Sequence, residues 1–105
     1  MVDAESIMIQ VLVHHQVADY NHWRSAFGAA LDFRRDGGES SCRIFRNARN
    51  PNDLTLLFEW ENIDCAKRHM TADELGEKMR QAGVVGVPEI QYLAEMYTVR
   101  RSAAD

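Results

Sequence analysis

The chain has 105 residues, of which 46% are hydrophobic and 27% charged, and its formal net charge is −4. This length and composition predict one globular domain that can bury a hydrophobic core. The negative charge argues against a dedicated nucleic-acid binder, whose surface must be basic to hold phosphates. No apolar run approaches the ~20 residues that cross a membrane. We therefore expect a single domain over residues 1–99 with a frayed tail at 100–105, and no membrane partner.

The first residues and the two cysteines indicate the compartment. Met1–Glu5 is acidic, unlike the start of a signal peptide. Cys42 and Cys65 form no metal-binding or redox motif, and two free thiols suit a reducing cytoplasm. The sequence leaves a disulfide between them open, but its simplest interpretation is a cytoplasmic protein.

Residues 6–17 alternate in the manner of a central strand that is covered on both faces. One face is apolar and ends at His15, whereas the other is mixed and carries His14. Because successive strand side chains point to opposite faces, these two histidines cannot bind one metal ion. The apolar face comprises Ile7, Ile9, Val11 and Val13.

A helix is predicted after this strand, with Asp19 as its N-cap and Gly37-Gly38 as its left-handed end. Residues at steps of three and four give this helix one inward face that is rich in aromatic side chains. That face comprises Tyr20, Trp23, Phe27, Ala30 or Leu31, and Arg34.

A β-hairpin is predicted next, with strands at 41–47 and 54–60 joined by the Asn50–Asp53 turn. The second of these strands has one wholly apolar face that ends in Trp60. Its other face carries Glu59, which we expect to pair with Arg43 or with a residue of a partner chain, because an unpaired buried charge is costly.

Two short helices and a final strand complete the prediction. The first helix is expected at 64–70 with an aspartate cap, and the second follows a capping box at Thr71 and Glu74. Gly83–Pro88 then has the composition of an apolar loop, and 89–99 that of the last strand.

The predicted order β-α-β-β-α-β is that of a ferredoxin-like α+β fold, in which helices cover one face of an antiparallel sheet. Right-handed crossovers place the first and third strands at its centre. The face without helices keeps too much apolar surface for a monomer, so we expect a homodimer that packs sheet against sheet. This surface comprises Met8, Leu12, Leu57, Leu93 and Tyr97.

Three motifs between about Ile7 and Tyr97 resemble those of the antibiotic-biosynthesis-monooxygenase-type dimeric α+β barrel superfamily. They are His15-x-Val17-x-Asp19-Tyr20-x-x-Trp23, Leu57-Phe58-Glu59-Trp60, and Gly83-Val-Val-Gly86-x-Pro88. The resemblance implies a dimeric α+β barrel. It leaves the reaction open, because the superfamily includes cofactor-free oxygenases, haem-degrading enzymes and other small-molecule enzymes.

The haem-degrading branch is disfavoured by two positions. In that branch, by resemblance, a tryptophan and then an iron-ligating histidine follow the third strand. This chain has His69 and Met79 at those positions. No His-x-x-x-His or Cys-x-x-Cys spacing occurs either, so the sequence predicts no metal and no cofactor.

His15 and His69 are the candidate catalytic bases, since histidine titrates near neutral pH. We expect both at an apolar pocket between the helices and the sheet, beside Trp60. For His15 the alternative is a hydrogen bond to Asp19 or to the start of the helix, and for His69 it is a solvated position on an amphipathic helix. The candidate ligand-binding residues are Tyr20, Trp23, Trp60 and Tyr92; Tyr20 and Trp23 can equally be core anchors.

Together with the absence of a metal motif, the resemblance implies a cofactor-free monooxygenase that acts on a small planar phenolic or polyketide-like compound. A deprotonated substrate of this class activates oxygen itself, so the protein needs an apolar pocket and a few polar groups. The alternative is a non-catalytic small-molecule-binding or stress-related dimeric barrel protein. Whether the pocket holds a base that solvent can reach would discriminate the two.

Overall fold

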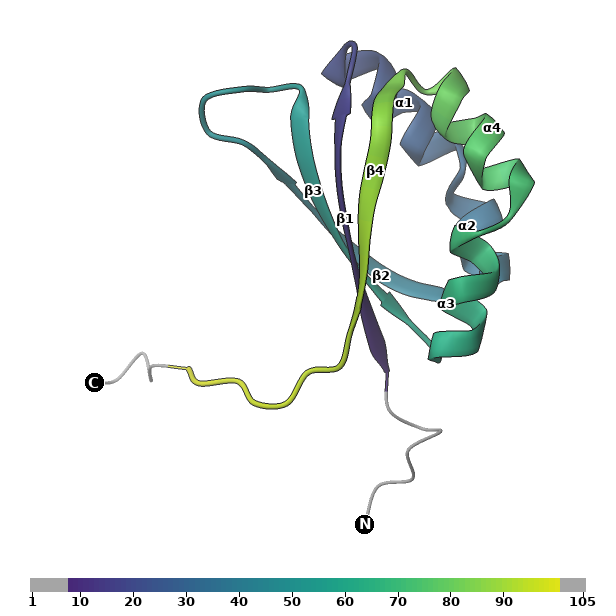
Figure 1. Cartoon of the computed structure of the whole chain (residues 1–105), viewed down its shortest axis with the longest axis vertical. Coiled ribbons are helices and arrows are strands. Elements are labelled where there is room, and N and C mark those ends of the chain that lie inside the picture. Colours follow the sequence, from purple (N-terminus) through teal and green to yellow (C-terminus); the bar gives the residue numbers. More distant parts are fainter. Residues whose placement is uncertain (1–7, 101–105) are drawn as a thin grey trace.

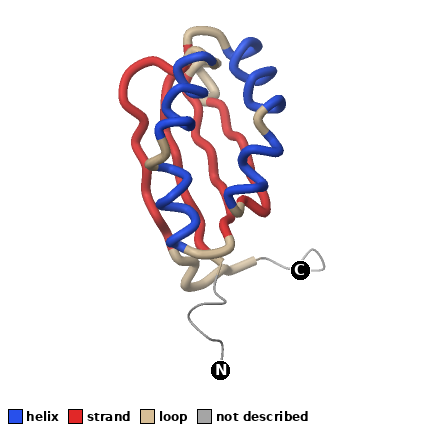
Figure 2. The backbone as a smooth tube through the Cα atoms, turned by 90° about the vertical axis from the view of Figure 1, so that its right-hand side faces the viewer, coloured by secondary structure: helices blue, strands red, loops and turns tan. Residues whose placement is uncertain are grey.

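The computed structural model describes residues 8–100, which form a four-stranded antiparallel sheet with all its helices on one face (Figure 1, Figure 2). The strand order β2-β3-β1-β4 places the first and third strands at the centre, as predicted, and confirms the ferredoxin-like α+β fold. The elements are β1 (Ile9–Val17), α1 (Tyr20–Ala29), α2 (Leu31–Gly37), β2 (Glu39–Arg46), β3 (Asp53–Trp60), α3 (Ile63–Met70), α4 (Asp73–Gln81) and β4 (Val84–Leu93).

The core lies between the central strands and the helices. Side chains of β1 and β3 alternate between the two faces of the sheet, and the apolar set of each strand faces the helices. Pairing of Val11 with Phe58 and of Val13 with Leu56 brings the two apolar sets together. No helix in residues 8–100 is long and apolar enough to cross a membrane.

The first predicted helix is in fact two helices. Asp19 is its N-cap as predicted, and its carboxylate accepts a hydrogen bond from the backbone N–H of His22. The helix then breaks at Ala30, where ψ is 13°, and α2 continues to a left-handed Gly38 with φ of 112°. The break changes the phase of the inward face, so that Phe33 as well as Arg34 reaches the core side.

The caps of the later helices differ from the prediction. Asn62, and not Asp64, caps α3, because its side-chain oxygen accepts the N–H of Cys65 at 2.8 Å. The expected capping box does not form. The Thr71 hydroxyl instead donates to the carbonyl of Lys67, and α4 begins after Ala72 without a side-chain cap.

The last strand begins earlier and ends earlier than predicted. Gly83–Pro88 is not a flexible loop, because β4 already starts at Val84 and pairs with β1. The register shifts opposite His15, where Gly86 has φ of 74° and Val87 is 92% exposed, as in a β-bulge. After Leu93 the chain leaves the sheet, so the predicted strand over 94–99 does not form.

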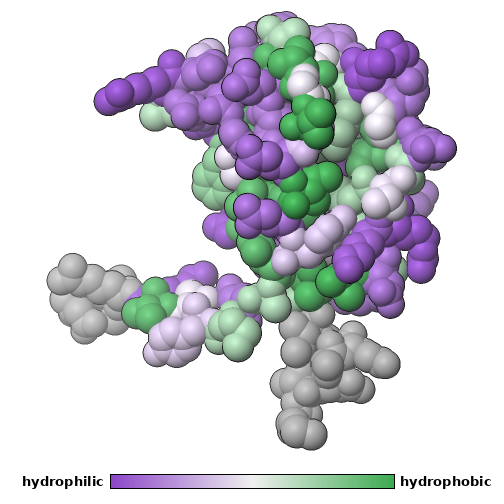
Figure 3. All heavy atoms as spheres, in the orientation of Figure 1, coloured by the Kyte–Doolittle hydropathy of each residue, from purple (hydrophilic) through white to green (hydrophobic). Residues whose placement is uncertain are grey.

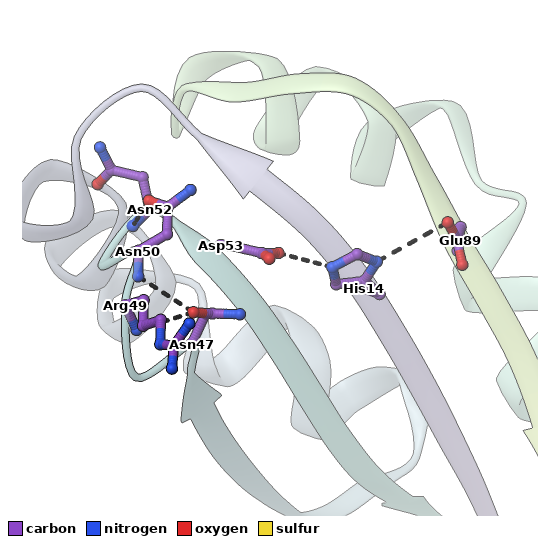
Figure 4. Close-up of polar contacts among 7 residues, drawn as sticks. All are labelled: His14, Asn47, Arg49, Asn50, Asn52, Asp53 and Glu89. Atoms are coloured by element: carbon purple, nitrogen blue, oxygen red, sulfur yellow. Dashed lines mark hydrogen bonds and ion pairs between the residues drawn. The ribbon is translucent and has the colours of Figure 1, made fainter.

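The sheet face without helices is partly apolar and partly polar. Leu12 and Leu57, which pair across β1 and β3, are half-buried on this face. His14 also lies here and contacts Asp53 on β3 at 2.6 Å and Glu89 on β4 at 3.8 Å (Figure 4).

Glu59 lies on the same face and is not paired with Arg43. Its carboxylate accepts a hydrogen bond from the Gln10 amide at 3.1 Å and a longer one from the Ser40 hydroxyl at 3.4 Å. Gln10 on β1 and Ser40 on β2 can both reach this carboxylate because β3, which carries Glu59, lies between those two strands. The alternative pairing with a residue of a partner chain stays a prediction.

Residues 94–100 extend away from the body of the molecule (Figure 1). Met96, Tyr97 and Val99 in this arm are 90%, 84% and 78% exposed. On the body, hydrophobic side chains also gather over β4 in the middle of the face shown in Figure 3. Most of the large exposed hydrophobic side chains of residues 8–100 therefore lie on the strands and on the arm, and Ile63 on α3 is an exception at 39% exposure. Residues 101–105 of the predicted tail and residues 1–7 lie outside the described range.

Two glycines provide a matched test of the fold. Gly38 has a positive φ, and an added Cβ would stand 3.3 Å from Cβ of Cys65, whereas a Cβ on Gly76 in α4 would meet nothing within 4 Å. We expect Gly38→Ala to lower the free energy of unfolding by about 1–2 kcal/mol or more. Gly76→Ala should raise it by up to about 1 kcal/mol. Urea denaturation measures both, and equal effects would contradict the assigned conformations.

Candidate functional site

An inner cavity of about 70 Å³, partly open to solvent, lies between the helices and the sheet. The strands supply its floor through Val13, His15, Leu56 and Phe58, and α1 and α2 supply an aromatic wall. Helices α3 and α4 close the other side with His69, Leu75 and Met79. The cavity is therefore apolar, with few polar groups, as ligand pockets usually are.

His15 is a buried member of this cavity, with only 5% of its surface exposed. Its imidazole makes an edge contact with Trp23, with ring centroids 5.9 Å apart, and Nδ1 has no hydrogen-bond partner among residues 8–100. The pKa of His15 is lowered, mainly by burial. The residue's own backbone has a smaller, opposite effect on this pKa, although Nδ1 makes no regular hydrogen bond. Asp19 is occupied in capping α1. His15 is consequently a neutral histidine at neutral pH.

His69 lies at the opposite end of the cavity and is 6% exposed. Its ring is placed between Phe33 and Trp60, with centroids 4.7 Å from each. Burial, and then the positive charge of Arg34, lower the pKa of His69. The solvated alternative for this histidine is thus wrong, and the cavity contains two histidines that are neutral at neutral pH.

Arg34 adds a buried positive charge to the cavity wall. Nε donates to the carboxylate of Glu39 at 2.8 Å, and one terminal nitrogen donates to the carbonyl of Phe27 at 2.5 Å. Its guanidinium also lies 3.6 Å above the ring of Phe27. Burial raises the pKa of Glu39, and the charge of Arg34 opposes this. The two side chains are only 8% and 5% exposed, so the ion pair holds Arg34 in position.

Lys78 is the second cation at the cavity. It lies 4.9 Å above the ring of Phe33 and lines the cavity from α4. Within the described part of the chain it makes no ion pair with a carboxylate. Glu39 offsets the charge of Arg34, so Lys78 is the cation at the cavity that favours an anionic ligand, or a ligand that becomes anionic, beside the two neutral histidines.

The remaining predicted site residues lie outside the cavity wall, apart from Trp23. Trp60 is completely buried behind His69, and its indole N–H has no partner in residues 8–100. Tyr20 contacts Trp23 and the guanidinium of Arg46. Tyr92 lies 5.7 Å from the ammonium of Lys67, and burial raises its pKa. A direct role of these three in ligand binding stays a prediction.

Sequence reasoning missed Phe33, Arg34 and Lys78 as members of the site. Arg34 was placed on the inward face but was given no role, and Phe33 was hidden by the break at Ala30. Lys78 follows Leu75 by three residues, so helical periodicity could have placed it beside the inward set.

An outer groove of about 310 Å³ lies next to the cavity, between α2 and α3. Arg35 and Asp36 line it from α2, and Cys65 and Arg68 from α3. Phe33 and His69 belong to both the groove and the inner cavity. The two spaces therefore share these two side chains.

Other reactive groups lie apart from the cavity. Cys42 and Cys65 are free thiols, and burial raises the pKa of Cys42 to about 12. Across residues 8–100, no three histidine, cysteine, aspartate or glutamate side chains come together in a group that could hold a metal ion.

Comparison with known proteins identifies the fold. No family model matches the sequence, and no curated protein matches it either. The structure is similar to a candidate antibiotic biosynthesis monooxygenase from Bordetella bronchiseptica, with a TM-score of 0.72, 18% identity and coverage of 87% of this chain and 99% of that chain. It is also similar to SnoaB, a cofactor-independent oxygenase from Streptomyces nogalater, at TM-score 0.66 and 14% identity over 94% of this chain and 99% of that one.

A third structure, a candidate antibiotic biosynthesis monooxygenase from Caulobacter crescentus, has a TM-score of 0.66 and 20% identity over 88% of this chain and 92% of its own. The chain thus has the fold of antibiotic biosynthesis monooxygenase-type proteins, as its sequence motifs predicted.

The two buried histidines predict a pH-dependent stability. Below the ordinary histidine pKa of 6.5 the unfolded chain takes up protons that folded His15 and His69 resist, so the free energy of unfolding should fall as the pH decreases from that value. His15→Gln and His69→Gln should each make this fall shallower in urea denaturation at a series of pH values. The exposed His22 supplies the control. If His22→Gln flattened the profile as much, the assignment would be wrong.

Proposed function

We propose that the protein is a cofactor-free monooxygenase that binds a small planar phenol in the inner cavity. The observation that carries this proposal is an apolar cavity lined by two neutral histidines and two cations. A neutral His15 can accept the phenolic proton at Nε2, since Nδ1 is fully buried. Lys78 then stabilises the phenolate that remains.

The reaction balances without a metal or an organic cofactor. The base removes the phenolic proton, and the phenolate transfers one electron to O₂. The two radicals combine at a ring carbon to form a peroxide. The ring proton moves to the distal peroxide oxygen as the O–O bond breaks, which gives a quinone and hydroxide, and the hydroxide takes a proton from the histidine to leave as water. One oxygen atom enters the product and the substrate supplies all the electrons.

Similarity of fold supports the class of reaction and leaves the substrate open. SnoaB is described as a cofactor-independent oxygenase, and its fold covers nearly the whole of this chain. An oxygenation without a cofactor needs an apolar site and a few polar groups, both of which this cavity offers. We also propose that the protein acts in the cytoplasm, where its two free thiols would stay reduced.

The small size of the cavity favours a second candidate function, a non-catalytic small-molecule-binding protein. An engineered cavity of roughly 150 Å³ holds benzene, whereas this cavity measures about 70 Å³ and is partly open to solvent. An aromatic ring bound here would therefore stay partly exposed. Partial exposure suits reversible binding, whereas oxygenation is favoured by exclusion of water from the reacting atoms.

Oxygen consumption tests the catalytic proposal. Dihydroxynaphthalenes should drive oxygen uptake at an electrode without added cofactor, and His15→Ala should lower the rate by roughly 10²-fold or more. Because the base acts in its neutral form and burial lowers the pKa of His15, the rate should stay high near pH 7 and fall only below about pH 6.5.

Ligand binding without oxygen uptake would favour the second candidate. Saturable quenching of tryptophan fluorescence reports binding, because Trp23 lines the cavity. His22→Ala, which alters an exposed histidine, provides the control and should keep both signals. Absence of quenching by any planar phenol would rule out both functions.

We further propose that two copies of the chain associate through the sheet face that lacks helices. This face carries Leu12 and Leu57 at the centre of the sheet, and the arm beyond Leu93 exposes further apolar side chains. Apolar surface of this kind is characteristic of contact sites. A second copy supplies a face and an arm of the same composition, as a two-fold interface requires.

A substitution on each side of the sheet tests this association. Leu57→Arg should yield monomer or insoluble protein, because it places a charge within an interface expected to bury about 1,200 Å² or more. Ile63→Arg, at a 39% exposed position on α3, should leave the assembly unchanged. Sedimentation at micromolar concentration measures both, and a monomeric wild-type protein would refute the proposal.

A further inference from the structure

The outer groove between α2 and α3 contains one of the two cysteines of the chain. At about 310 Å³ it is at the lower end of the range of roughly 300–1,000 Å³ that is usual for small-molecule sites. Cys65 lines this groove, whereas Cys42 lines neither the groove nor the inner cavity. Burial raises the pKa of Cys42 to about 12, which makes its thiol unreactive. Of the two thiols, only that of Cys65 is placed to react with a molecule in the groove.

His69 gives the groove a proton acceptor next to this thiol. It follows Cys65 by four residues on α3, and residues at this spacing are neighbours on one helix face, with Cβ atoms about 5–6 Å apart. Helical side chains lean towards the N-terminal end of their helix, so the imidazole leans towards the turn that carries Cys65. Both residues line the groove.

The two glycines at the end of α2 bring the thiol-bearing residue and the imidazole to one place. A Cβ on Gly37 would stand 2.5 Å from Nδ1 of His69, and a Cβ on Gly38 would stand 3.3 Å from Cβ of Cys65. Both glycines also line the groove. Because these glycines are adjacent in the chain, Cys65 and Nδ1 of His69 lie in the same part of the groove.

The imidazole of His69 is free to act as a base. The residue is only 6% exposed, and its ring nitrogens form no hydrogen bond within residues 8–100. Burial, and then the positive charge of Arg34, lower the pKa of His69, so the ring is neutral at neutral pH and can accept a proton. Buried polar groups usually have a hydrogen-bond partner. Here the thiol, or a molecule bound in the groove, can provide one.

Four charged side chains surround this part of the groove. Arg35 and Asp36 on α2, Glu61 before α3 and Arg68 on α3 are exposed, and they make no ion pair within the described residues. Guanidinium groups bind carboxylates, and carboxylates bind ammonium groups. The groove therefore fits a small molecule that carries charges of both signs, as a short peptide does.

We propose that Cys65 is a site of reversible thiolation by a small peptide-like disulfide that carries both carboxylates and ammonium groups. His69 accepts the proton of the thiol, and the thiolate attacks one sulfur of the disulfide. The S–S bond of the reagent breaks as the new S–S bond forms, and the departing thiolate takes the proton from His69. The sulfur of Cys65 is oxidised and the departing sulfur is reduced, so the exchange needs no further oxidant. An excess of the small thiol reverses it.

The modified cysteine would lie beside the inner cavity, because Phe33 and His69 line both spaces. Thiolation of Cys65 therefore connects the state of the small thiols around the protein to the surroundings of the cavity. The site does not rest on the proposed oxygenase function, since the exchange uses neither a phenol nor oxygen.

Mass spectrometry of the full chain tests the site, with glutathione disulfide as the reagent. At neutral pH we expect one glutathionyl group per chain, on Cys65, and a rate that saturates with reagent concentration. S-methylglutathione, which cannot react, should slow the reaction by competition. Cys42→Ala should be modified like the wild type, and Cys65→Ala should stay unmodified. Equal modification of Cys42, or a rate that neither saturates nor responds to the competitor, would overturn the proposal.

Charge substitutions test the fit of the groove. Arg35→Gln and Arg68→Gln should each slow the reaction with glutathione disulfide about two- to fivefold, and should leave the reaction with the uncharged hydroxyethyl disulfide unchanged. Arg49→Gln removes the same charge from an exposed position between β2 and β3 and should change neither rate. An equal loss in Arg49→Gln would show that net charge alone governs the rate, and the assigned ligand would be wrong.

A pH profile tests the role of His69. His69→Gln should slow the reaction at neutral pH about tenfold or more. The difference should vanish above about pH 9, where a thiol ionises without a base. A constant difference at every pH would contradict the role of the imidazole as proton acceptor. If His69→Gln does not fold, Gly37→Ala, which must displace the ring from Gly37, is a second variant with the same expected profile.

These measurements separate the site from the proposed function. Thiolation of Cys65 in a protein that consumes no oxygen with any phenol would keep this site and remove the oxygenase proposal. Oxygen uptake by a protein whose Cys65 stays unmodified would remove the site and keep the oxygenase proposal.

Discussion

The structure depends on the packing of one apolar sheet face, formed by β1 and β3, against the inward side of the helices. Val11, Val13, Leu54, Leu56 and Phe58 are all nearly inaccessible to solvent on this face. At about 25 cal/mol for each Å² of apolar surface removed from water, such packing is the dominant favourable contribution to folding. It also determines where the site can be, because His15 follows Val13 at the same two-residue period and must point into the same layer.

The electrostatics of the site follow from this burial. A histidine in an apolar layer is held neutral, and the same layer accepts the cation Arg34 only because Glu39, Phe27 and the carbonyl of Phe27 surround it. Neutral bases and the cation Lys78 are a suitable combination for generating and stabilising an anion. The bulge in β4 lies directly opposite His15, so the irregular part of the sheet and the candidate base occur at one place.

Much of the fold was predictable from the sequence because it rests on local periodicity. The alternation of β1 and β3, the Asp19 cap and the glycine at the end of α2 were all read correctly. The errors have physical causes. Asn62 and Asp64 are both acceptable caps, and only the exact start of α3 distinguishes them. The residues of Gly83–Pro88 have turn-forming composition, yet pairing with β1 makes most of them a bulged strand.

By itself the sequence determined the architecture and the presence of His15 and His69 on the helix side, since strand and helix periods assign side chains to faces. Only the tertiary structure decided which side chains meet. It placed His69 between Phe33 and Trp60, left Trp60 behind the wall, and brought Arg34 and Lys78 to the cavity from different helices. These contacts depend on the break at Ala30 and on the distance between α2 and α3, which no local pattern encodes. For that reason the size of the cavity, and the two rings that it shares with the groove, could be found only in three dimensions.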